Sequence, residues 1–67
     1  MNANVKANQV AQIENSITTA QTEKANAERT VASPRFAHLA AVTATVVAEL
    51  ENFIAEQTAE LNALNAS

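Results

Sequence analysis

The sequence predicts an all-α chain of two long helices, and three observations support this prediction. The 67 residues include no glycine and only one proline, so tight turns between strands have almost no suitable residues. Alanine occurs 16 times and has the highest helix propensity of any residue. On both sides of the proline, apolar residues recur at alternating steps of three and four, which is the spacing of one helix face.

The first helix is expected over residues 3–32, with Asn2 or Asn4 as its N-terminal cap. Its apolar positions form a thin heptad pattern that includes two alanines and one lysine. The large residues of this pattern, which we expect to form a packing interface, are Val10, Ile13, Ile17 and Val31, with Ala20, Lys24 and Ala27 between them.

The helix is expected to break at Ser33 and Pro34. A residue before proline is pushed out of the α region, and a serine hydroxyl is a good helix N-cap. Proline itself suits the first position of a helix. The sequence therefore predicts a second helix over residues 34–65 that is capped by Ser33.

The second helix carries two patterns. Its large apolar residues continue the packing interface, with a one-residue drift near position 53: Phe36, Leu39, Val42, Val46, Leu50, Phe53, Ile54, Leu61 and Leu64. Alanines recur at steps of three, four and seven on another side of the helix. They form a possible second packing face: Ala41, Ala44, Ala48, Ala55 and Ala59.

Two shapes fit these helices. An antiparallel helical hairpin is favoured because two apolar patterns of similar length meet at one break. An open, kinked or L-shaped pair is the alternative, because Thr30, Val31, Ala32 and Ser33 are all poor at the left-handed φ that a reversal often uses. Folding about residues 33–34 would place Lys6 opposite Glu60, and Lys24 and Arg29 opposite an uncharged stretch.

Composition excludes several classes of protein. The chain has no cysteine, four basic residues, seven acidic residues and a net charge of −3, so no nucleic-acid contact is expected. No apolar stretch reaches the roughly 20 residues of a transmembrane helix, and the first ten residues lack the apolar core of a signal peptide.

Catalytic, cofactor and metal sites are not expected. His38 is the only histidine, there is no aspartate, and no residues are spaced like a catalytic triad. Glu56 and Glu60 share a helix face, but calcium usually needs six to eight oxygen ligands. The serine at position 33 is accounted for by its expected capping role.

The sequence favours a structural, non-enzymatic role. Only 16 residues are large and apolar, too few for an independent core, and 16% of residues are charged against roughly 25% in typical soluble domains. We expect a subunit that assembles in many copies, with itself and with other proteins of one assembly such as a virion or filament, in a virion or extracellular setting. The alternative is a small helical adaptor whose second helix docks on a partner protein.

Overall fold

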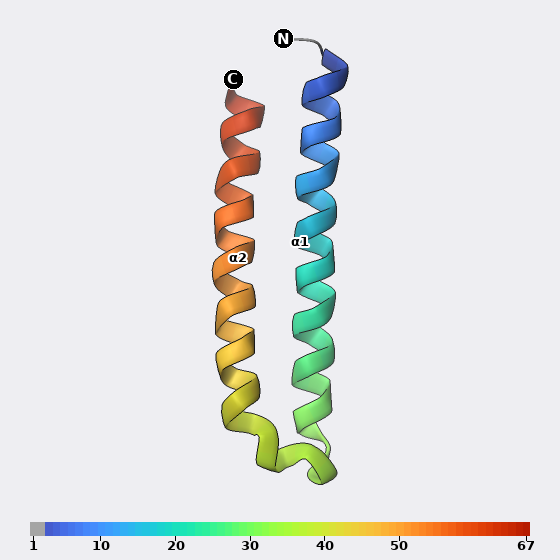
Figure 1. Ribbon diagram of the computed structural model, residues 1–67, viewed down its shortest axis with the longest axis vertical. Helices are drawn as coiled ribbons and strands as arrows, with labels where there is room; N and C mark the ends of the chain where they lie inside the picture. Colours follow the sequence, from blue (N-terminus) through green and yellow to red (C-terminus); the bar gives the residue numbers. More distant parts are fainter. Residues whose placement is uncertain (1–2) are drawn as a thin grey trace.

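The chain forms two antiparallel helices that lie side by side and are joined by a short turn (Figure 1). The computed structural model describes residues 3–67. Helix α1 spans Ala3–Ala32, the 3₁₀ helix η1 spans Pro34–Leu39, and helix α2 spans Ala40–Ala66. The prediction of an all-α fold with two packed helices is confirmed, and the structure adopts the hairpin rather than the open form.

The hairpin is a thin rod. It measures 51 × 15 × 11 Å and has a radius of gyration of 15.5 Å, whereas a compact domain of this length would have about 11 Å. Two helices in one layer have only one shared side, so most of each helix faces outward. Among residues 3–67, only Ile13 and Ala20 are buried, and each keeps a small exposed fraction.

The turn differs from the expected break in two respects. The α-helical part of the second segment begins at Ala40 rather than at Pro34, because Pro34–Leu39 forms a 3₁₀ helix. Ser33 does precede the helix in an extended conformation, with φ −75° and ψ 133°, but its side chain makes no capping hydrogen bond. Its main chain is used instead: the Ser33 amide donates to the Thr30 carbonyl, and the Ser33 carbonyl accepts from the Phe36 amide.

The 3₁₀ geometry explains how the chain reverses. Six residues at about 2.0 Å rise span roughly 12 Å, enough to cross the 8–10 Å that typically separate two packed helix axes. No residue in the described part of the chain has a positive φ. The reversal is therefore made by η1 without a left-handed residue, so the argument that favoured the open form does not apply to this turn.

The helix ends also differ in part from expectation. Asn4 lies inside α1 and so does not occupy a cap position, while Asn2 lies outside the described residues. At the other end, the Ser67 hydroxyl donates to the Leu64 carbonyl over 2.8 Å. This hydrogen bond satisfies one of the carbonyls that the end of α2 leaves without a helical partner.

Candidate interaction surface

The two helices meet along a continuous heptad seam. In α1, the inward positions agree with the predicted pattern, and Ile13 and Ala20 are only 8% and 4% exposed. The half-buried seam residues are Val10, Ile17, Lys24, Ala27 and Val31 in α1, and Thr43, Val47, Leu50, Ile54, Gln57, Leu61 and Leu64 in α2. The α2 positions follow steps of four and three without interruption, so the predicted drift near position 53 is absent from the seam.

Five of the large residues assigned to the packing interface lie mostly outside this seam. Val47 faces α1 in place of Val46, which is 44% exposed, and of the neighbours Phe53 and Ile54 it is Ile54 that lies in the seam, while Phe53 is 40% exposed. Val42 is 66% exposed. Leu39 and Phe36, in η1, are also exposed.

Four of these exposed residues share one side of the second segment, and we call them the outer apolar stripe: Leu39, Val42, Val46 and Phe53. Within α2, the spacing of four and seven places Val42, Val46 and Phe53 on one helix face, and Leu39 directly precedes this face as the last residue of η1. Phe53 also lines a shallow groove between the helices, together with Leu50, Ala20, Ser16 and Glu23. The hairpin thus exposes side chains that would normally be covered.

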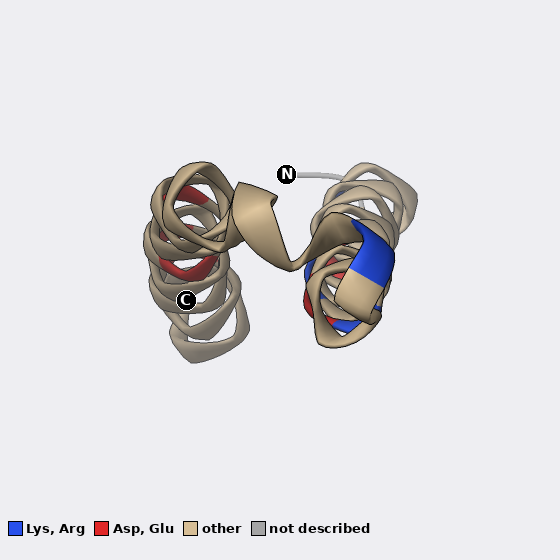
Figure 2. Cartoon of the chain, turned by 90° about the horizontal axis from the view of Figure 1, so that it is seen from below, with Lys and Arg blue, Asp and Glu red and all other residues tan. Residues whose placement is uncertain are grey.

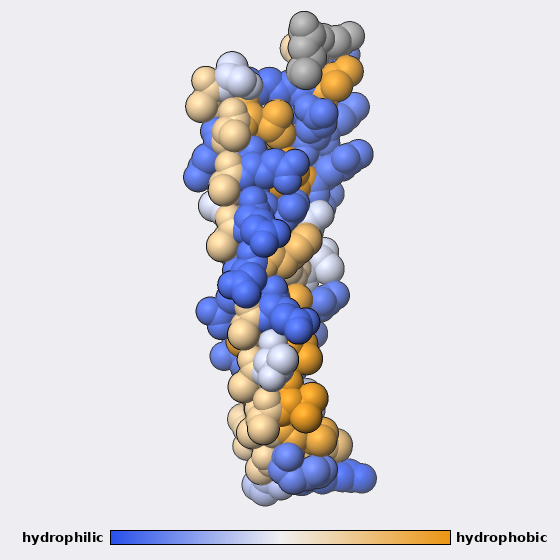
Figure 3. All heavy atoms as spheres, turned by 60° about the vertical axis from the view of Figure 1, so that its left-hand side comes forward, coloured by the Kyte–Doolittle hydropathy of each residue, from blue (hydrophilic) through white to orange (hydrophobic). Residues whose placement is uncertain are grey.

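The alanines of the predicted second face are all exposed on α2. We call this set the alanine stripe: Ala41, Ala44, Ala48, Ala55 and Ala59. Figure 3 shows weakly apolar residues running along the length of α2, with the more hydrophobic residues gathered beside them at the turn end. At 100° per residue, the alanine stripe and the outer apolar stripe lie about 140° apart around α2.

The exposed surface is large for the mass of the chain. The hairpin has 4819 Å² of solvent-accessible surface, whereas a folded 7.1 kDa monomer would expose about 4,100 Å². The excess of roughly 700 Å² is close to the area, about 800 Å², that one partner buries in a standard protein interface.

The charged residues place the helices in a different register from the expected one. Lys24 Nζ lies 3.9 Å from Glu51 Oε1, so Lys24 does not face an uncharged stretch. Lys6 Nζ donates to the main-chain oxygen of Ser67 over 3.0 Å and not to Glu60. In sequence, the residues halfway between the members of each pair lie inside η1. The chain therefore reverses about η1 and not about residues 33–34.

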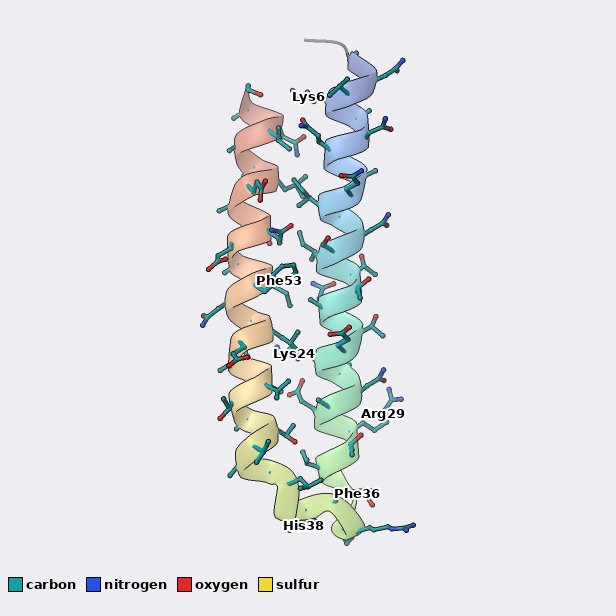
Figure 4. All side chains as sticks on the ribbon, in the orientation of Figure 1. Lys6, Lys24, Arg29, Phe36, His38 and Phe53 are labelled. Carbon is teal, nitrogen blue, oxygen red and sulfur yellow. The ribbon has the colours of Figure 1, made fainter. Side chains whose placement is uncertain are left out.

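The two ends of the hairpin differ in charge. All four basic residues precede α2, whose charged residues are the glutamates at 49, 51, 56 and 60. Seen from the turn end, the α1 side shows both basic and acidic residues, whereas α2 shows acidic residues without basic ones (Figure 2). Lys24 projects toward α2, whereas Arg29 points away from it (Figure 4). The Arg35 guanidinium lies 5.6 Å from the Phe36 ring centre, so Arg29 and Arg35 leave the turn end basic.

Among residues 3–67, no group of three or more His, Asp or Glu side chains is placed to hold a metal ion. No single described helix has the length and apolar composition to cross a membrane; α1 and Pro34–Ala66 meet that test only as a pair bent by 112°. No protein family, curated protein or solved structure matches the chain.

Proposed function

We propose that the chain is a structural, non-enzymatic subunit that assembles in many copies through helix packing, as in a filament or virion. The observation that carries this proposal is the outer apolar stripe. The hairpin leaves its four residues at least 39% exposed, while it buries only two side chains among residues 3–67, Ile13 and Ala20. Contact with another chain would remove this apolar surface from water, which is the main driving force for association.

The arrangement of the two stripes supports assembly beyond a pair. The alanine stripe and the outer apolar stripe lie on different sides of α2, so a neighbour on one stripe leaves the other accessible. Small side chains allow a second helix to approach closely. The low share of charged residues, 16%, also lowers the desolvation cost of packing several copies together.

Light scattering on the purified chain over a concentration series tests this proposal. We expect the mean mass to rise with concentration to several times 7.1 kDa, with helicity measured in parallel by circular dichroism. A fully helical species that keeps the monomer mass over the whole series would refute assembly.

An adaptor that docks on a different protein is the second candidate, because Phe36, Leu39, Val46 and Phe53 are exposed. Leu50, which belongs to the same predicted packing interface, is half-buried in the seam. Docking through Leu50 would therefore require the hairpin to open. The same light-scattering series separates the candidates: a helical monomer favours the adaptor, and a large species formed without a partner excludes it as the main role.

A further inference from the structure

We propose that the outer apolar stripe binds a second copy of this chain, with the two α2 helices antiparallel and crossing near Val46. This inference rests on the proposed function and specifies the contact between two neighbouring subunits of the assembly. The stripe follows a heptad spacing distinct from the seam, in which four of six positions are apolar (Leu39, Val42, Val46 and Phe53) and two are the glutamates Glu49 and Glu56. Apolar residues at this spacing form the contact side of a packed helix, and the two glutamates place charge within the same row.

Area supports a second copy as the occupant. The whole rod exposes roughly 700 Å² more than a compact monomer of its mass, so burying one side of it in a standard interface of about 800 Å² per partner would restore the surface of a compact protein. A symmetric dimer requires one surface to be complementary to itself. The outer apolar stripe meets this condition because large apolar residues lie on both sides of Val46: Leu39 and Val42 before it, and Phe53 after it.

Charge supports the antiparallel direction. In a parallel pair, Glu49 and Glu56 of one copy would lie beside the same residues of the other, and the arginine-bearing turn ends would coincide. In an antiparallel pair centred on Val46, the two Glu49 residues are offset by six residues, or about 9 Å along the helix. The partner's Glu56 then lies level with position 36, beside Arg35 in the turn, and this electrostatic complementarity favours the antiparallel orientation over the parallel one.

Single-cysteine variants test the surface, because the chain has no cysteine of its own. Val46→Cys places a thiol at the centre of the proposed contact. Thr22→Cys is the matched control, since Thr22 is exposed and lies on the side of α1 away from the seam. We expect disulfide-linked dimers to form about ten times faster for Val46→Cys, because the contact raises the local thiol concentration.

A mixing experiment tests the direction. Leu39 and Phe53 lie seven residues on either side of Val46, so an antiparallel pair brings Leu39 of one copy level with Phe53 of the other. An equimolar mixture of Leu39→Cys and Phe53→Cys should therefore give mostly the mixed dimer, and each variant alone should cross-link slowly. All these positions are partly exposed, and circular dichroism verifies that each variant remains helical.

The outcomes separate this inference from the proposed function. Equal rates for Val46→Cys and Thr22→Cys, in a chain that assembles by light scattering, overturn the surface and leave the proposed function standing. Rapid cross-linking of Leu39→Cys and Phe53→Cys each with itself overturns the antiparallel direction. A monomer at every concentration overturns both the contact and the proposed function.

Discussion

Replacing Ile13 by alanine should destabilise the hairpin more than any matched change on its outer surface. Ile13 is 8% exposed and is the largest buried side chain of the seam. Isoleucine-to-alanine changes in protein cores cost about 2–5 kcal/mol. A rod of two helices surrounds Ile13 less completely than a globular core does, so we expect the lower end of this range. A loss of about 2 kcal/mol lowers the melting temperature of a domain this small by about 8–16 °C.

Val5→Ala is the matched control on the same helix. Val5 is 46% exposed, and its replacement by alanine also removes a β-branched residue. Both substitutions therefore gain a similar amount of helix propensity, a few tenths of a kcal/mol. The difference between the two variants isolates the burial of Ile13, and Val5→Ala alone should change stability by less than about 0.5 kcal/mol.

Thermal melts followed by circular dichroism at 222 nm measure both variants, at one concentration and again at a tenfold lower one. Ile13→Ala should melt well below the unmodified chain at both concentrations, because the seam lies within one chain. If the melting temperatures of the two variants fall by the same amount, the assignment of Ile13 to the seam is wrong.

Three further predictions concern the ion pair, the turn and the hairpin itself. Lys24→Ala and Glu51→Ala should each change the free energy of unfolding by less than about 1 kcal/mol, because exposed ion pairs contribute little. Urea titrations at low and high salt measure this change, and a larger loss that depends on salt would contradict the prediction. Pro34→Ala should lower stability by about 0.4–1 kcal/mol through the added freedom of the unfolded chain, as thermal melts can show, while gained stability would count against the turn geometry. Spin labels at Ala11 and Ala63, in samples diluted with unlabelled chain, should lie within roughly 20 Å in a hairpin whose axes are 8–10 Å apart, and a distance of several tens of ångströms would rule the hairpin out.

The class of the fold could be predicted from the sequence because absence of glycine and helix-period spacing both favour helices. The seam residues of α1 could also be predicted from the sequence, because no second large apolar residue lies next to any of them in the chain. In α2, however, Val46 is followed by Val47, and Phe53 by Ile54. Either member of each pair fits a heptad pattern, so periodicity alone cannot determine which member faces α1.

The geometry of the turn determines which of Val46 and Val47, and which of Phe53 and Ile54, faces α1. Local sequence signals do not predict this geometry. Ser33 and Pro34 indicate a helix start, and the same residues are equally compatible with an α-helical or a 3₁₀ first turn. Because η1 occupies Pro34–Leu39, the fold axis moves along the chain. The Lys24 and Glu51 pair follows from this shift, and a pairing scheme centred on Ser33 could not find it.

The number of residues in η1 determines which side of α2 faces α1 and which side faces outward. One residue inserted into or deleted from Pro34–Leu39 would rotate α2 by about 100° relative to α1. Such a change would turn a different row of α2 side chains toward α1 and expose part of the present seam. Substitutions within η1 that preserve its length would leave this orientation intact, since no described position there depends on a positive φ. Natural variation in the turn should therefore be tolerant of residue identity and intolerant of insertions and deletions.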